Sequence, residues 1–279
     1  MMYPSLVRSY KGLYPFRLGT TSFIYPDDYI PNVRLLGPYL EDIELLLFES
    51  TYTDALPNRK VIAALCGLAK EFDLTYNIHL PTDISISSQN PHEQNRAVDT
   101  ILAVMDLTDL LAPSTFTLHV PFNEDSFKDD EVKIWQERVI NNLERVLAGG
   151  IQSRLISIEN LDYPFQMVEK IISILDLRVC LDLGHLIVHN DDIQRFYSRN
   201  SDQISIIHLY GVDQKHFHRG LNHLAPKFID PVLAILKEFK GSVSLEVFSF
   251  DHLDASLEFL ETHWIHMQKD NLSNRAKAP

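Results

Sequence analysis

The chain has 279 residues, of which 45% are hydrophobic and 23% charged, so it is long enough to form a domain with a large core. Its formal net charge is −13, and no run of lysine and arginine exceeds two residues, which argues against binding to extended nucleic acids. No apolar stretch reaches the ~20 residues that span a bilayer, and the start lacks the apolar segment of a signal peptide. Cys66 and Cys180 lie within apolar patterns, as expected of reduced core residues. We therefore expect a cytoplasmic protein without membrane contact.

Short apolar runs alternate with segments whose apolar residues recur at helical spacing. We predict strands at about residues 17–22, 42–48, 74–79, 114–119, 154–159, 178–183, 204–209 and 242–247. We predict helices at about residues 28–40, 57–72, 92–111, 127–148, 163–176, 191–201, 226–240 and 252–267. Repeated strand–helix units of this kind form a parallel sheet, and eight of them close into a (β/α)8 TIM barrel.

The length also fits a single (β/α)8 barrel, which typically has roughly 250 residues. An open, doubly wound sheet is the alternative, but the first strand ends in Gly19-Thr20-Thr21-Ser22 and not in a glycine-rich phosphate loop. We assign residues 1–16 to an N-terminal lead-in, 17–267 to a catalytic barrel domain and 268–279 to a polar C-terminal tail.

Most of the predicted strands end in a residue that can bind a metal ion. In a barrel the carboxyl ends of all strands converge on one face, where active sites lie. Imidazoles outnumber carboxylates in this set, which favours zinc or another first-row transition metal over magnesium or calcium. The candidate ligands are His79, His119, Glu159, Asp182, His185, His208 and Glu246, together with His216 and His218 after the seventh strand.

Each histidine taken alone, such as His79 or His119, fits an ordinary hydrogen-bonded core residue. Glu159 and Glu246 carry more information, because a carboxylate that ends an apolar run is costly to bury without a positive partner. The repetition of such residues from strand to strand therefore favours a metal site.

This series of strand ends resembles the xylose-isomerase-like barrels, and among them the endonuclease IV type of metallophosphodiesterase, over residues 17–265. The resemblance implies that Glu159 bridges two ions. It places the first ion on His79 and His119, and the second on Asp182, His208 and Glu246. A third ion would take His185 and an Asp-x-His pair. Here that pair is His216-x-His218, with histidine where the family has aspartate, and the spacing of Asp213 does not match.

Three further segments, FRLGTTSFIYPDDYIPNVRLL, DIELLLFES and HFHRGLNHL, resemble the cobamide-remodelling phosphodiesterases of the same superfamily. That resemblance implies hydrolysis of the phosphoester in the nucleotide loop of a cobamide, which releases the lower-ligand riboside and a cobinamide phosphate. We accordingly expect a phosphoric diester hydrolase with two or three divalent ions, zinc or manganese. Its catalytic residues would be Glu159, Asp182 and Glu246.

Several residues near the strand ends are candidates for contact with this corrinoid substrate. Lys215 and Arg219 flank the His216-x-His218 pair and carry charge that can hold a phosphate, although solvated loop charges have the same pattern. Glu49 lies at the end of the second strand. Phe122 and Tyr210, with Phe217, would line an apolar mouth suited to a bulky planar substrate. The histidines expected at the surface are His92, His189, His252, His263 and His266.

Three other functions stay open. A sugar isomerase or epimerase would bind one ion through Glu159, Asp182, His208 and Glu246, and its two glutamates would shuttle a proton. That enzyme has no need of the additional histidines. Abasic-site DNA cleavage is disfavoured by the net charge of −13. A metal-binding sensor or chaperone without turnover is the remaining alternative.

Overall fold

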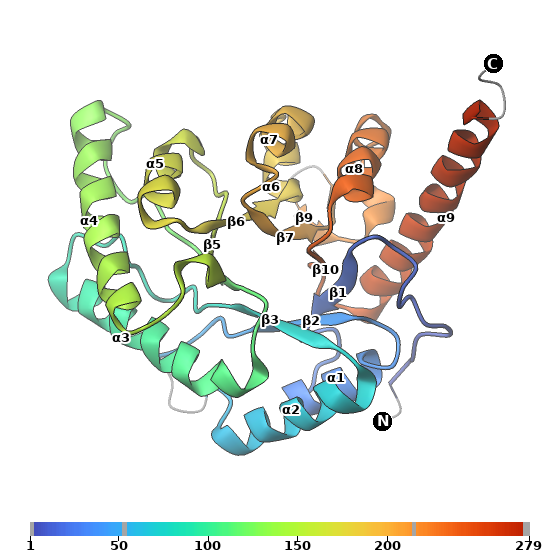
Figure 1. Ribbon diagram of the computed structural model, residues 1–279, viewed down its shortest axis with the longest axis horizontal. Helices are drawn as coiled ribbons and strands as arrows, with labels where there is room; N and C mark the ends of the chain where they lie inside the picture. Colours follow the sequence, from blue (N-terminus) through green and yellow to red (C-terminus); the bar gives the residue numbers. More distant parts are fainter. Residues whose placement is uncertain (1–2, 52–54, 214–215, 276–279) are drawn as a thin grey trace.

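Eight parallel strands form a closed barrel in the order β1-β10-β7-β6-β5-β4-β3-β2, and helices surround it (Figure 1). The structure is a computed structural model that describes residues 3–51, 55–213 and 216–275, with side chains up to residue 269. The predicted single-domain (β/α)8 barrel is therefore confirmed. The barrel strands are β1 (Arg17–Thr21), β2 (Asp42–Leu46), β3 (Thr75–His79), β4 (Phe116–Leu118), β5 (Ile156–Glu159), β6 (Arg178–Asp182), β7 (Ile204–Leu209) and β10 (Ser242–Leu245).

The barrel strands are buried along nearly their whole length because both of their faces are covered. Every residue of β2, β4, β5 and β10 is buried. Helices cover the outer side of the strands, and side chains from neighbouring strands fill the inside. Polar residues are also buried in the strands, and several that can bind a metal ion lie where the strands end. Glu159 and Asp182 are the last residues of β5 and β6, and His208 pairs with Asp182 across β6 and β7.

The connecting helices begin and end at residues with recognisable local chemistry. The Asn58 side chain caps α2 by accepting hydrogen bonds from the amides of Lys60 and Val61. Asn90 caps α3, whose first residue is Pro91, a favoured residue at that position. The helices are α1 (Tyr29–Leu36), α2 (Arg59–Phe72), α3 (Pro91–Thr108), α4 (Asp129–Ala148), α5 (Gln166–Leu175), α6 (Leu183–Val188), α7 (Ile193–Asn200), α8 (Pro226–Glu238) and α9 (Phe250–Arg275).

Two elements close to the strand ends were not predicted. The short helix α6 follows β6 directly, so the chain turns into it at Asp182. An antiparallel pair, β8 (Gly211–Asp213) and β9 (His216–Arg219), follows β7. Both were missed because they are too short to show a periodic pattern. Single 3-10 turns occur at Asp109–Leu111, Ser153–Leu155 and Leu221–His223.

The two ends of the chain are attached to the barrel more extensively than the sequence predicts. Leu6, Tyr10 and Tyr14 of the lead-in are buried, and the Tyr14 ring lies 5.3 Å from the Trp264 ring of α9. Helix α9 continues to Arg275, into the predicted polar tail, because no glycine or proline interrupts this stretch. Figure 1 shows its C-terminal part projecting beyond the other helices. No helix in the described part of the chain combines the length and apolar character needed to cross a membrane.

Candidate metal centre

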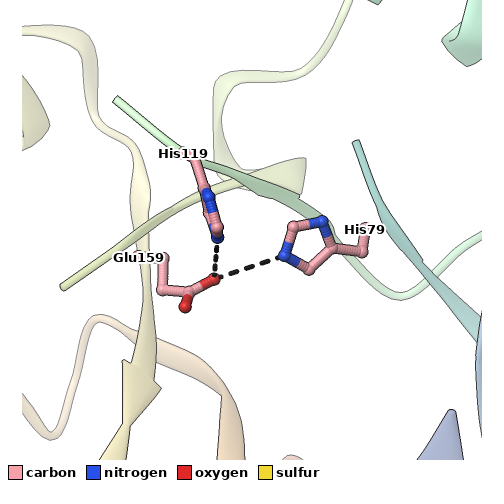
Figure 2. Close-up of side chains that lie close together, drawn as sticks. All are labelled: His79, His119 and Glu159. Carbon is pink, nitrogen blue, oxygen red and sulfur yellow. Dashed lines mark hydrogen bonds and ion pairs between the residues drawn. The ribbon is translucent and has the colours of Figure 1, made fainter. Parts of the chain in front are cut away.

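His79 and His119 both face one oxygen of Glu159 (Figure 2). Glu159 Oε2 lies 3.5 Å from His79 Nε2 and 3.0 Å from His119 Nε2. His79 is buried, and its Nδ1 lies 2.9 Å from the carbonyl oxygen of Leu80. Donation from Nδ1 to that carbonyl leaves Nε2 of a neutral imidazole with a lone pair that faces the carboxylate. Two lone pairs in such an arrangement require a proton or a cation between them.

The second group lies beside Glu159 and consists of Asp182 on β6, His208 on β7 and Glu246, which directly follows β10. His208 Nδ1 lies 3.3 Å from Glu246 Oε2 and 3.8 Å from Glu159 Oε2. One donor atom from each of Asp182, His208 and Glu246 lies within 4.8 Å of the others. Since Glu159 Oε2 also faces His79 and His119, this single carboxylate is shared between the two groups.

The electrostatics of the centre are those of buried carboxylates held by imidazoles. Burial alone would raise the pKa of Glu159, but His119, His79 and His208 hold it well below its usual range. Burial would likewise lower the pKa of His208, but nearby negative groups raise it well above its usual value. At Asp182 burial prevails over the imidazoles and raises the pKa to about 7. A cation that replaces these protons would satisfy the same carboxylates.

Asp182 is held in place from several sides. Asn160 donates to the Asp182 carbonyl at 2.9 Å and accepts from its amide at 2.8 Å. The Tyr210 hydroxyl donates to Asp182 Oδ2 at 3.1 Å, while the amide of His185 donates to Oδ1 at 2.8 Å. Gly184 makes room for the tyrosine, because a Cβ at this position would lie 2.1 Å from Tyr210 Cε2. Tyr210, which we expected to line the substrate mouth, is fully buried and contacts Asp182.

The sequence prediction omitted Glu44, a buried residue in the middle of β2. Glu44 Oε1 lies 2.9 Å from His208 Nε2, although the two atoms are not in hydrogen-bonding geometry. Its other oxygen accepts a hydrogen bond of 2.6 Å from Ser244. Glu44 therefore places a negative charge beside Nε2 of His208, while Glu246 lies beside Nδ1 of the same ring. The signal for it in the sequence was a single glutamate inside the apolar run DIELLLF, where an inward-facing charge needs a partner.

The residues assigned to a third ion do not come together. His185 lies beside Asp182, with 3.8 Å between His185 Nε2 and Asp182 Oδ2. His216 is exposed on β9, and His218 Nδ1 faces the carbonyl oxygen of Glu246 at 3.0 Å. Within the described ranges, no group of three potential ligands contains either His216 or His218. Instead, His185 forms a group with Asp162 and His189.

The proposed substrate contacts are scattered around the strand ends. Arg219 is half-buried on β9, and its Nε is buried without a hydrogen-bond partner among the described residues. Glu49 is exposed beyond β2. Phe122 is half-buried and packs against Trp135 with 5.4 Å between ring centroids. Lys215 lies outside the described residues.

The donor set fits divalent transition-metal ions. Glu44, Glu159, Asp182 and Glu246 are each at most 5% exposed, and within the part of the chain described, all their ion pairs are with histidines. Buried carboxylates without lysine or arginine partners are stable only when protons or metal ions compensate their charge. Mixed imidazole and carboxylate ligands suit zinc, manganese and related ions.

Comparison with solved structures gives the same fold at low sequence identity. A D-tagatose 3-epimerase-like protein is 17% identical with a TM-score of 0.74, over 91% of this chain and 99% of its own. An L-ribulose 3-epimerase is 15% identical with a TM-score of 0.70, over 95% and 100%. An AP endonuclease of family 2 from Brucella melitensis is 15% identical with a TM-score of 0.62, over 88% and 98%. At these identities the likeness establishes the fold alone.

The sequence itself decides the family. A search of curated proteins found no match to this chain. The family model described as "Xylose isomerase-like TIM barrel" matches residues 40–263, which include every residue of the two ligand groups. The chain therefore belongs to the xylose isomerase-like TIM barrel family.

Proposed function

We propose that this protein is a metal-dependent phosphodiesterase that uses two divalent ions, with Glu159 shared between them. The observation that carries the proposal is the pair His79 and His119, whose Nε2 atoms both face Glu159 Oε2. One ion can be held by Glu159, Asp182, His208 and Glu246 alone. A one-ion enzyme does not require two further imidazoles on the same carboxylate, whereas in a two-ion phosphodiesterase they can serve as ligands of the second ion.

The residues present would divide the work as follows. His79 and His119 would hold one ion with Glu159, and Asp182, His208 and Glu246 would hold the other. When bound, such ions supply charge for the phosphate oxygens and make a water molecule more acidic. Asn160 and Tyr210 keep Asp182 in a fixed position, and Glu44 constrains the ring of His208.

A cobamide is the substrate that we propose to test first. The supporting observations are the three sequence segments that resemble cobamide-remodelling enzymes and the aromatic rings at the strand ends. Phe48 lies beside His79 with 5.4 Å between ring centroids, and Phe248 lies beside His218 with 4.9 Å. Phe217 lies 5.5 Å from the His185 ring. These rings give the mouth flat apolar surface next to the ligand residues, which suits a planar ligand.

A one-ion ketose epimerase is the second candidate, and the solved structures favour it. Several neighbours are named as sugar epimerases, and they match this chain with higher TM-scores than the AP endonuclease does. The required set is present in Glu159, Asp182, His208 and Glu246. In this reaction the two glutamates would remove and return a proton on opposite faces of the sugar carbon.

Metal content and product analysis together separate the two functions. Metal-free protein would be reloaded with Zn²⁺ or Mn²⁺, its bound ions counted by elemental analysis, and its activity followed on a cobamide, a ketohexose and abasic duplex DNA. We expect two or more ions per chain and release of a lower-ligand riboside, with phosphate left on the corrinoid. His119→Ala should abolish this cleavage, whereas the matched variant His92→Ala, which replaces an exposed histidine of α3, should not. One ion per chain with ketose epimerisation and no phosphoester cleavage would establish the second candidate instead.

A further inference from the structure

We infer that Asp162, His185 and His189 form a separate binding site for a divalent transition-metal ion at the rim of the barrel. Asp162 lies in the loop after β5, His185 lies in α6, and His189 directly follows α6. Asp162 Oδ1 lies 3.1 Å from His185 Nδ1 and 3.2 Å from His189 Nε2. One donor atom from each residue lies within 4.8 Å of the other two.

These distances match those between ligands that share one ion. Metal–nitrogen and metal–oxygen bonds of about 2.1 Å place neighbouring ligand atoms about 3.0–3.4 Å apart in octahedral or tetrahedral geometry. His185 and His189 are four positions apart in the sequence, so the helical turn between them places both imidazoles on the same side of α6. Two imidazoles and one carboxylate form a set typical of first-row transition metals, and they leave positions open for water or another oxygen ligand.

The surroundings favour a cation and provide space beside it. The three residues line a cavity of about 520 Å³. The charged residues that line the cavity have a negative sum, since the carboxylates, including that of Asp162, outnumber the arginines by four to two. The carboxylates are those of Asp162, Glu169, Asp191 and Asp192, and the arginines are Arg195 and Arg199. Arg199 is itself 3.4 Å from Glu169, so one of the two positive charges is already paired with a carboxylate of the cavity.

The rim site, formed by Asp162, His185 and His189, lies next to the inner centre, which consists of the two ligand groups that share Glu159. The imidazole of His185 connects the two. His185 Nδ1 faces Asp162, while His185 Nε2 lies 3.8 Å from Asp182 Oδ2. An ion on Nδ1 therefore leaves the proton of the neutral ring on Nε2, directed towards the inner carboxylate. This site would take Asp162 and His189 in place of the His216-x-His218 pair predicted for a third ion. It requires neither of the two reactions proposed above.

Cobalt(II) titration of the full chain tests the inference directly. Metal-free wild-type protein, Asp162→Asn, His189→Ala and the control His266→Ala would be titrated with Co²⁺, and bound ions would be counted after removal of free metal. His266 is an exposed histidine of α9 outside the ligand groups. We expect Asp162→Asn and His189→Ala to bind one ion fewer per chain than wild type, and His266→Ala to bind the wild-type number.

A second pair of variants gives a signal that a merely structural role would not produce. His189→Cys should develop a near-ultraviolet thiolate-to-cobalt charge-transfer band on Co²⁺ addition, because a thiolate at this position would be a metal ligand. His266→Cys and wild type, which keeps Cys66 and Cys180, provide the background. Unchanged ion number in His189→Ala, together with no added band in His189→Cys, would show that the three residues are only hydrogen-bonded and would overturn the inference.

Discussion

Replacement of Asp42 by asparagine should stabilise the protein at neutral and alkaline pH. Asp42 is the first residue of β2 and is fully buried. Thr75 and Asn77 donate hydrogen bonds to its two oxygens at 2.5 and 2.6 Å, but burial prevails and raises its pKa to about 7. An asparagine keeps the oxygen that faces Thr75. Its amide group would face Asn77, whose own Oδ1 is buried without a partner among the residues that the structure describes and can accept the new hydrogen bond after rotation of that amide.

The magnitude follows from the difference between the folded and unfolded pKa values of Asp42. The folded value is raised, so the folded protein holds this proton more tightly than the unfolded chain does. The advantage is complete below pH about 4 and is lost as the pH rises to about 7. Each pKa unit corresponds to about 1.4 kcal/mol, so the change from 3.8 to about 7 costs the folded state about 4 kcal/mol above pH 7.

Denaturant unfolding of metal-free wild type and Asp42→Asn at pH 5 and pH 8 measures this cost. The free energy of unfolding of the variant relative to wild type should increase by about 3 kcal/mol between these pH values. Other titrating groups, including Asp182, are common to both proteins and cancel in the difference. Metal content should not change, because Asp42 begins its strand about four residues, or roughly 13 Å, from the end that carries the ligands. A difference that stays constant between pH 5 and pH 8 would refute the argument.

Four further substitutions test the centre and its support. Glu159→Gln should nearly abolish turnover while circular dichroism remains that of wild type, because the amide keeps the volume but loses the charge that two cations share; near-normal rates at saturating metal would exclude a shared carboxylate. His79→Ala or His119→Ala should each lower metal content by about one ion per chain, as elemental analysis can show. Gly184→Ala should destabilise the fold by about 1–3 kcal/mol, because its Cβ would overlap the Tyr210 ring; an unchanged unfolding midpoint would contradict this.

The barrel could be predicted because most of its strands are buried on both faces and contain short runs of apolar residues. The same property allowed the ligand positions to be predicted. A polar residue at the end of such a run, such as Glu159 or Asp182, stands out and lies where strands converge. Helix α6 could not be predicted from such a pattern, since its six residues continue the apolar run of β6. The extension of α9 was missed because its polar residues resemble a tail, although nothing in them ends a helix.

The separation of His216 from His218 has a different cause, which is backbone geometry. The resemblance to the endonuclease IV type of site assigned His216 and His218 to one ion, and residues two apart on a strand normally face the same side. His218 has a φ of 55°, in the left-handed region, so the alternation of side chains is interrupted there. His218 turns towards Glu246, and His216 stays exposed. A single sequence carries no sign of this φ value.

Two histidines connect the inner centre to its surroundings, because each has a carboxylate near both of its ring nitrogens. His208 lies between Glu44 on one side and Glu246 on the other, and His185 lies between Asp162 and Asp182. An imidazole with a carboxylate at each nitrogen can carry two protons, or one proton and one metal ion, without moving its ring. The carboxylate that receives the proton thereby determines which nitrogen is free to bind the ion. Glu44, which the sequence prediction omitted, can thus determine which nitrogen of His208 is free for metal, whereas Asp182 would receive the proton of His185 when an ion binds at Nδ1 beside Asp162.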